Sequence, residues 1–257
     1  MSEKHIFRKN LKTKYFDMHS HILPGVDDGA KSIEESLKML DMAYKEGVRY
    51  VCATPHYSIE HPGSLKQRMM VYGDLKQRLA RIHPDMKLFF GTEILYSYDV
   101  PEQLSKGRIP TLNGSRYVLV EFYPSASYKS LLEAVKSLIY AGYRPVLAHM
   151  ERLDCLWKQS DRLDELKSFS VIFQMNAGCL VGSRFSPEVR NCRKLVREGY
   201  IDILGTDMHD TVHRPPIYKE AADWIAENCG ETICRRIVYE NAAAILQNQQ
   251  VIGEKDE

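Results

Sequence analysis

The sequence predicts an α/β protein whose parallel strands form a closed or nearly closed barrel of the (β/α)7 type. Three observations lead to this prediction. Apolar segments of strand length alternate with helical segments, about seven such units follow one another, and metal-capable side chains stand where the predicted strands end. The chain has 257 residues and shows no internal repeat or low-complexity linker, so we expect a single domain.

The first units show the signals on which each element is predicted. Residues 15–21 form a short strand that leads into a turn, and the following helix begins at a capping box of Ser32 and Glu35 and ends at Gly47. Residues 48–54 form a buried strand, because β-branched and aromatic residues dominate the segment. By the same criteria the later predicted strands are 86–93, 116–122, 145–152, 171–178 and 201–210, and the predicted helices are 65–82, 129–140, 161–169, 187–198, 217–228 and 231–246.

Charge and composition count against several classes of function. The net charge is +1 and the isoelectric point is near 7.6, so no global basic field favours binding to nucleic acid or to an anionic membrane. We find neither an apolar leader nor a run long enough to insert into a membrane, and we expect a cytoplasmic protein. The 6 cysteines are scattered without a paired CxxC motif, which favours reduced thiols over a disulfide framework.

Residues with metal-binding side chains gather at the predicted strand ends. They are His19, His21, His56, Glu93, Glu121, His149, Asp207 and His209. In β/α barrels the side chains at the carboxyl ends of the strands converge on one opening. Residues two apart on a strand face the same side, so the HxH and DxH pairs each present two ligands in one direction. Imidazole mixed with carboxylate favours Mn, Fe or Zn over Ca or Mg, and the sequence therefore predicts a site for several transition-metal ions.

Structural roles are the alternative for each of these residues taken alone. A single histidine is more often hydrogen-bonded in a core or on a surface, and Glu121, beside an apolar Val-Leu-Val run, could be an ion-pair partner. The joint pattern favours metal binding. The histidines without such placement are expected on the surface: His5, His61, His83 and His213. His213 nevertheless stands close to the Asp-Met-His element, and residues 57–73 form either a substrate-facing loop or part of a helix core.

Six motifs occur in an order that resembles the PHP (polymerase and histidinol phosphatase) superfamily: DMHSHILPGVDDGA, ATPHY, GTEI, VLVEF, LAHMER and GTDMHD, the last followed by RPP. Within this superfamily the chain is similar to the bacterial metal-dependent protein-tyrosine phosphatases of capsule and exopolysaccharide loci, the CpsB/YwqE type. The stretch HSHxLPGxDDG is far more specific than a bare HxH. The resemblance covers residues 15–247, and a polar arm at 1–14 and a polar tail at 248–257 lie outside it.

The resemblance implies a distorted β/α barrel that holds three divalent ions, most often Mn2+, with Fe or Zn as alternatives. Carried over position by position, the ligands of the three ions are His19, His21, Glu93 and Asp207 for the first, Glu93, Glu121 and His149 for the second, and Asp28, His56 and His209 for the third. Asp27 is then expected to support the turn or a neighbouring ligand. Arg152 and Arg214 match positions that contact phosphate.

The implied substrate is phosphotyrosine in a protein, namely the C-terminal tail of a bacterial tyrosine kinase that governs polysaccharide export. We expect metal-activated hydroxide to attack phosphorus directly while Arg152 and Arg214 clamp the nonbridging oxygens. No covalent phosphoenzyme is then needed. The sequence identifies no general acid, and Asp210, next to His209, is a candidate for relaying a proton.

Other functions stay open at this point. The nearest is a small-molecule phosphatase such as histidinol phosphatase, which would use the same metals. A nuclease would need a basic groove with aromatic stacking platforms, against which the near-neutral charge counts. A metal-loaded but noncatalytic partner of a kinase is a third. Cys229 and Arg235 stand in C-x5-R spacing, but CGETICR lacks the further glycines and the preceding histidine of a phosphate cradle, so we do not expect a cysteine-based phosphatase.

Overall fold

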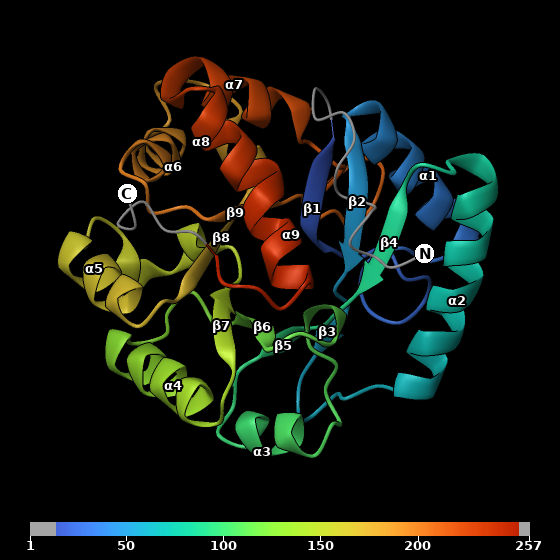
Figure 1. Cartoon of the computed structure of the whole chain (residues 1–257), viewed down its shortest axis with the longest axis horizontal. Helices are drawn as coiled ribbons and strands as arrows, with labels where there is room; N and C mark the ends of the chain where they lie inside the picture. The colour runs from blue at the N-terminus through green and yellow to red at the C-terminus, as the bar shows by residue number, and fades with distance from the viewer. Residues whose placement is uncertain (1–13, 252–257) are drawn as a thin grey trace.

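Parallel strands curl around a common centre and are encircled by helices (Figure 1). A computed structural model describes residues 14–251 of the chain. The strands in this range are β1 (Tyr15–Ser20), β2 (Val48–Ala53), β3 (His56–Tyr57), β4 (Lys87–Phe90), β5 (Glu93–Leu95), β6 (Tyr117–Glu121), β7 (Arg144–Leu147), β8 (Ile172–Asn176) and β9 (Ile203–Gly205). Their order is β1-β2-β4 in one sheet and β3-β5-β6-β7-β8-β9 in the other, and every pairing is parallel.

The two sheets are continuous across a bend. Because β2 continues into β3 and β4 into β5, the strands occupy seven positions around the barrel. The chain bends between β2 and β3, at Thr54 and Pro55, and again between β4 and β5, at Gly91 and Thr92. Across the bend the N–H of Gly91 donates to the carbonyl of Ala53 at 2.9 Å. The single strand predicted at 86–93 is therefore wrong in its extent. At the bend, the missing side chain of Gly91 lets Leu112 pack closely, because a Cβ there would lie 2.7 Å from a methyl carbon of Leu112.

On the other side of the barrel β1 and β9 approach each other. Ser20 pairs with Met208 through an isolated parallel bridge, and the N–H of His21 donates to the carbonyl of Met208 at 3.0 Å. The predicted distorted (β/α)7-type barrel is confirmed.

The helices in the described range are α1 (Ile33–Lys45), α2 (Leu65–Ile82), α3 (Val100–Ser105), α4 (Tyr128–Tyr140), α5 (Ser160–Ser168), α6 (Pro187–Arg197), α7 (Lys219–Cys229), α8 (Glu231–Arg235) and α9 (Asn241–Leu246). A π-helical turn at Arg236–Glu240 joins α8 to α9, so the final predicted helix is continuous but not regular. Short 3-10 turns occupy Leu112–Gly114, Met150–Arg152, Asp154–Leu156 and Ala177–Leu180. The short helix α3 was not predicted.

The helix starts follow the predicted caps. Ser32 Oγ accepts the N–H of Glu35 at 3.2 Å and so begins α1. The Glu35 carboxylate accepts the N–H of Lys31 at 2.8 Å, so the predicted capping box closes one residue earlier than its usual form. The helix predicted at 65–82 is α2, and its Met69 and Met70 are 46% and 69% exposed, so they are not helix core.

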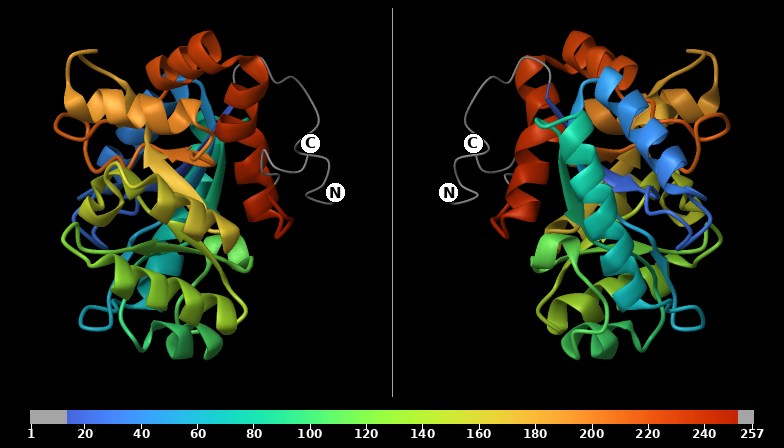
Figure 2. Two further views of the ribbon diagram at one scale, coloured as in Figure 1. Left: turned by 90° about the vertical axis from the view of Figure 1, so that its left-hand side faces the viewer. Right: turned by 90° about the vertical axis from the view of Figure 1, so that its right-hand side faces the viewer.

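The last helical segment closes the end of the barrel opposite the strand ends that carry the metal-capable residues. The ring of Tyr239, in the π turn, packs edge-on against Phe16 near the start of β1, with centroids 5.1 Å apart. In the side views of Figure 2, α9 and the loop after β1 lie on opposite sides of the strands. The carboxyl ends of the strands are thus left as the open face.

No helix in the described part of the chain combines the length and the apolar character that crossing a membrane requires. The predicted arm lies outside the described residues except for Lys14, and so does the tail beyond Val251. The first tail residues contact β6, because the hydroxyl of Tyr117 donates to the carbonyl of Gln249 at 2.8 Å.

Candidate metal centre

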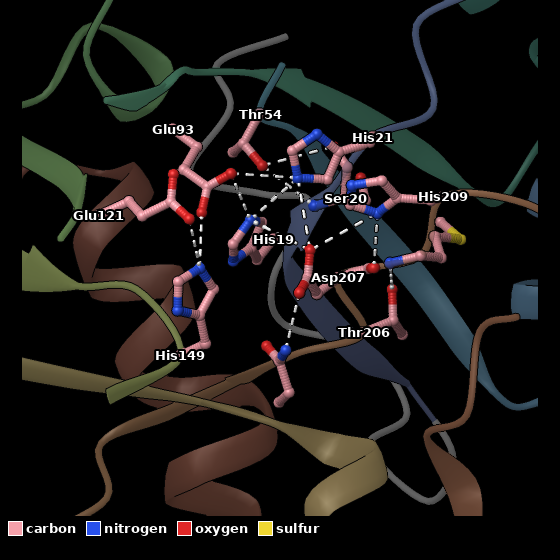
Figure 3. A network of polar contacts seen from close by, with 12 residues as sticks. His19, Ser20, His21, Thr54, Glu93, Glu121, His149, Thr206, Asp207 and His209 are labelled. Atoms are coloured by element: carbon pink, nitrogen blue, oxygen red, sulfur yellow. Dashed lines mark hydrogen bonds and ion pairs between the residues drawn. The ribbon is translucent and has the colours of Figure 1, made fainter. Parts of the chain in front are cut away.

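Four side chains from three strand ends meet at the centre of the open face (Figure 3). His19 Nε2 lies 3.1 Å from His21 Nε2, and Glu93 Oε2 lies 3.1 and 3.2 Å from these two nitrogens. Asp207 Oδ1 lies 3.6 and 3.4 Å from them. Ligand atoms that share one ion at about 2.1 Å stand roughly 3.0–3.4 Å apart in octahedral or tetrahedral geometry. The spacing of these four atoms fits a single cation.

The outer nitrogens of both imidazoles have hydrogen-bond acceptors. His21 Nδ1 lies 2.9 Å from Asp27 Oδ2, and His19 Nδ1 lies 3.0 Å from Gln174 Oε1. A neutral imidazole that donates through Nδ1 leaves its Nε2 lone pair free, which is the state a metal ligand needs. Both histidines are fully buried, so the orientation of their lone pairs is fixed by these contacts.

Further groups of ligand atoms adjoin this first one. His56, Glu93 and Glu121 each offer an atom within 4.8 Å of the others, and so do His21, Asp28, His56 and His209. Asp28 Oδ1 lies 3.4 Å from the Nε2 atoms of both His56 and His209. His21 and His56 each belong to two of these groups. The position-by-position assignment gave each of them to one ion only.

His149 lies beside Glu93 on its other side. Its Nε2 is 2.9 Å from Glu93 Oε1 and 3.4 Å from Glu121 Oε1. Glu93 therefore contacts histidines through both carboxylate oxygens and stands between the groups. All nine predicted ligands converge on one opening.

The loop after β1 folds back so that Asp28 reaches the cluster. Gly25, with φ of 65°, donates its N–H to the carbonyl of Ala30 at 2.8 Å, and Ala30 donates to the carbonyl of His21 at 3.0 Å. A side chain at Gly29 would collide with the backbone of His21, so only glycine allows this close return. The opening motif HSHILPGVDDG is explained by this geometry.

Asp27 supports its neighbours, as the resemblance implied. Besides its contact with His21, its carboxylate accepts the N–H of Gly29 at 3.0 Å and the N–H of His56 at 3.1 Å. Asp28, by contrast, has a side chain that is 65% exposed and faces the open side of the cluster.

The electrostatics of the cluster favour a bound cation. Burial opposes the ionisation of Glu93, but the positive potential of His19 and hydrogen bonds from the histidines hold the pKa of Glu93 well below its usual range. Burial also disfavours protonation of His149, yet hydrogen bonds to Glu121 and Glu93 raise the pKa of His149 to about 10. A pocket that attracts protons this strongly also attracts metal ions.

His209 behaves differently. Burial and the nearby His21 lower the pKa of His209 to about 4, so it is neutral near pH 7. Its Nδ1 lies 2.9 Å from the carbonyl oxygen of Asp207, and its buried Nε2, although 3.4 Å from Asp28 Oδ1, forms no hydrogen bond with the described residues. An unpartnered buried nitrogen carries a free-energy cost unless something binds it, and a metal ion fits this position.

Two of the candidate ligands have strained backbones. His149 and Asp207 have φ of 30° and 54°, in the left-handed region that side-chain-bearing residues seldom adopt. Each lies two residues beyond the end of a strand, β7 for His149 and β9 for Asp207. Such strain often marks a functional site, because the surrounding fold must hold the residue in place.

Arg152 and Arg214 stand at the mouth of the site and both contact Asp207 Oδ2. The Arg152 contact is 2.8 Å, and the side chains of Arg152 and Arg214 are 43% and 38% exposed. Asp207 thus faces the histidines with Oδ1 and the two guanidinium groups with Oδ2. Asp210, the candidate proton relay, instead accepts the N–H groups of residues 212–214 and shapes the turn that carries Arg214.

Two polar residues of β8 were missed by the sequence analysis. Gln174 is fully buried, and its Oε1 accepts the N–H of His149 at 2.7 Å in addition to contacting His19. Its Nε2 donates to Asn176 Oδ1 at 3.0 Å, and Asn176 Nδ2 donates to Asp207 Oδ2 at 2.8 Å. The available signal was two amides at alternate positions of an otherwise apolar strand.

The remaining sequence predictions fall outside the cluster. His83 Nε2 lies 3.0 Å from Asp41, on the helical side of the barrel. Arg235 pairs with Glu240 at 2.7 Å, so the C-x5-R segment is a helix junction and not a phosphate cradle. His5 lies outside the described residues.

Comparison with known proteins agrees with this geometry. The family model described as "Capsular polysaccharide synthesis, CpsB/CapC" matches residues 15–247. The tyrosine-protein phosphatase CpsB of Streptococcus pneumoniae is 32% identical over 244 residues, which cover 91% of this chain and 99% of the relative.

Solved structures give the same result. A chain from a crystallographic study of YwqE from Bacillus subtilis and CpsB from Streptococcus pneumoniae, described as metal-dependent tyrosine phosphatases, superposes with a TM-score of 0.85 at 27% identity and covers 93% of this chain and 97% of its own length. Histidinol phosphate phosphatase from Lactococcus lactis shares the fold alone, with a TM-score of 0.53, 15% identity, and coverage of 88% of this chain and 94% of its own. The resemblance stated from the motifs is confirmed, and the chain belongs to the CpsB/CapC family of capsular polysaccharide synthesis proteins.

Proposed function

We propose that this protein is a metal-dependent phosphatase that removes phosphate from tyrosine residues of a protein substrate. The observation that carries the proposal is the convergence of five histidines and four carboxylates, Glu93 among them, at one opening, with two half-exposed arginines at the same mouth. The relatives named as tyrosine-protein phosphatases support it, since they match the chain over nearly its whole length.

The proposed enzyme binds three divalent ions. We propose Mn2+ as the native metal, with Fe or Zn as alternatives. His19, His21, Glu93 and Asp207 would hold the first ion. The other two would be held by the remaining ligands, which are Asp28, His56, Glu121, His149 and His209, together with Glu93. When bound, such ions make hydroxide available from water near neutral pH and offset the charge that develops on phosphate.

The arginines then bind the phosphate. Each guanidinium presents donors in a planar fork that matches two phosphate oxygens. Arg152 and Arg214 both contact Asp207 Oδ2, which keeps both guanidinium groups beside the cluster. Phosphate would take over these donors while Asn176 continues to satisfy the same oxygen of Asp207.

The leaving group needs little help from the protein. A tyrosine phenolate is a better leaving group than an alkoxide, so the reaction does not depend on a dedicated general acid. The carboxylate of Asp210 is engaged by three backbone N–H groups and is assigned to holding the Arg214 turn rather than to proton transfer.

The partner we propose is the phosphorylated C-terminal tail of a bacterial tyrosine kinase, acting in the cytoplasm. A flexible tail suits a mouth at which Asp28 and both arginines are exposed. The described cysteines are free thiols, as expected in a reducing compartment.

Turnover of two substrates tests the proposal. Protein reconstituted with Mn2+ is expected to hydrolyse a phosphotyrosine peptide with kcat/KM at least about tenfold above that for histidinol phosphate. The reverse preference would favour the small-molecule phosphatase. Alkylation of the partly exposed thiols serves as a control and should leave turnover unchanged, because no cysteine belongs to the groups of candidate metal ligands among the described residues.

A further inference from the structure

A separate cavity, lined by two arginines, lies behind the metal centre, on the other face of β3. It has a volume of about 350 Å³ and is lined among others by Tyr57, Gly63, Arg68, Gln103 and Arg108. His56 and Tyr57 alternate along the strand, so His56 faces the metal cluster while Tyr57 faces this cavity. The metal centre and the cavity share one strand as their wall.

Arg68 is the unusual feature of the cavity. It is only 4% exposed, yet it forms no ion pair with any described carboxylate. Its guanidinium makes one hydrogen bond, from an Nη atom to the carbonyl of His56 at 2.6 Å, and its Nε is buried without a partner. A buried charge normally has a counterion, because leaving it unpaired away from water destabilises the fold.

The residues that line the cavity add positive potential around Arg68. The carboxylate of Asp27 attracts the Arg68 guanidinium from outside this lining, but it forms no ion pair with Arg68 and is already engaged by His21 and by the N–H groups of Gly29 and His56. Arg108 lies at the rim of the cavity and donates to Gln103 Oε1 at 3.0 Å. The 18-residue helix α2 begins at Leu65 beside the cavity, so the positive end of its dipole faces the same space. None of the described residues that line the cavity is acidic.

We propose that this cavity binds an oxyanion, a phosphate or carboxylate group, between Arg68 and Arg108. The anion supplies the counterion that Arg68 lacks, and the cavity has room for it together with several water molecules. Two sources have this chemistry: a free ion, or a second acidic or phosphorylated side chain on the protein substrate. The site itself is independent of the proposed phosphatase activity, whereas its use by a substrate rests on that activity.

Binding through Arg68 would act on the metal centre through the backbone. Arg68 holds the carbonyl of His56, whose imidazole lies 2.9 Å from Glu93 through Nδ1 and 3.4 Å from Asp28 through Nε2. Gly63 packs so closely on the guanidinium that a side chain there would lie 2.7 Å from it. An anion in the cavity therefore fixes the position of the loop between β3 and α2.

Crystals of the Mn2+-loaded full chain soaked in tungstate test the site, because anomalous density locates this oxyanion directly. We expect density in the cavity next to Arg68 and Arg108, besides any density at the metal centre. Arg108→Gln and Gln103→Glu are expected to lower tungstate occupancy in the cavity at least about fivefold, since one removes a donor and the other supplies an internal carboxylate. Arg78→Gln is the matched control, because Arg78 lies on α2 but pairs with Asp74 away from the cavity.

Tungstate at the metal centre with none in the cavity of the unmodified protein would overturn the proposal, and so would equal cavity density in Arg108→Gln.

Peptide kinetics separate the two sources of the anion. If the substrate supplies the anion, Arg108→Gln raises KM at least about fivefold for a phosphotyrosine peptide with a second acidic group. The KM for a phosphotyrosine peptide without that second group then stays unchanged. If a free ion is the ligand, cavity density is lost in the variant while both peptides keep their KM. If the unmodified protein hydrolysed none of the substrates but still bound tungstate in the cavity, the phosphatase proposal would be wrong and the anion site would stand.

Discussion

Gln174 Oε1, on β8, lies 3.0 Å from His19 Nδ1, on β1. The same oxygen accepts the N–H of His149 at 2.7 Å. One buried amide therefore orients an imidazole in the first ligand group and holds the strained backbone of a second candidate ligand. Such partners behind a ligand set its tautomer and direction.

Replacing Gln174 by Leu is expected to weaken metal binding by about ten- to a hundredfold, because His19 loses the acceptor that fixes its tautomer. Titration of metal-free protein with Mn2+, followed by paramagnetic resonance, measures this directly. Gln174→Glu keeps an acceptor and should retain more affinity than Gln174→Leu. The control is Gln67→Leu, at an exposed position on α2. Equal Mn2+ affinity in Gln174→Leu and Gln67→Leu would show that Gln174 does not orient a ligand.

Arg152→Lys and Arg214→Lys are each expected to lower kcat/KM for a phosphotyrosine peptide by about tenfold or more, because lysine cannot form the bidentate contact with phosphate. The glutamine variants should lose more. Mn2+ affinity should change little, since neither guanidinium is a ligand. Arg190→Gln, at an exposed position on α6, is the control. The assignment is wrong if both lysine variants keep the kinetics of the control.

Tyr218 anchors the segment that follows the Arg214 turn to β1. Its fully buried hydroxyl donates to the carbonyl of Phe16 at 2.6 Å. Tyr218→Phe should lower the free energy of unfolding by about 1–3 kcal/mol, because the buried carbonyl loses its partner. Urea unfolding of the Mn2+-loaded protein measures this change. Tyr140→Phe, where the side chain is 96% exposed, should leave the unfolding curve within error of the unmodified protein. Identical curves for both variants would contradict the anchoring role.

Much of the fold could be predicted because each unit carries local signals. Ser32 and Gly47 delimit the first helix, and β-branched residues mark the strands. The convergence of eight of the nine candidate ligands followed from the rule that strand ends meet at one opening, whereas Asp28, in the loop after β1, was expected only from the resemblance. Their detailed grouping did not follow, because it depends on how His21 and His56 turn toward Asp28.

What the sequence could not predict arises from long-range contacts. Leu112 packs closely on Gly91 from another segment of the chain. The role of Gln174 depends on residues 155 and 25 positions away in the chain. The cavity around Arg68 arises where the loop after β3 meets the segment after α3. Local patterns carry no information about such meetings.

Glu93 gives the most direct test of the central claim, because its carboxylate contacts His19, His21, His56 and His149. The measurement is phosphotyrosine turnover and bound-metal content of the unmodified protein and of Glu93→Gln, each stripped by a chelator and then supplied with Mn2+. We predict that the unmodified protein regains several ions and full turnover, whereas Glu93→Gln, folded by circular dichroism, binds fewer ions and loses at least about a thousandfold in kcat. Full turnover by the metal-free protein, or by Glu93→Gln, would contradict the metal-dependent mechanism.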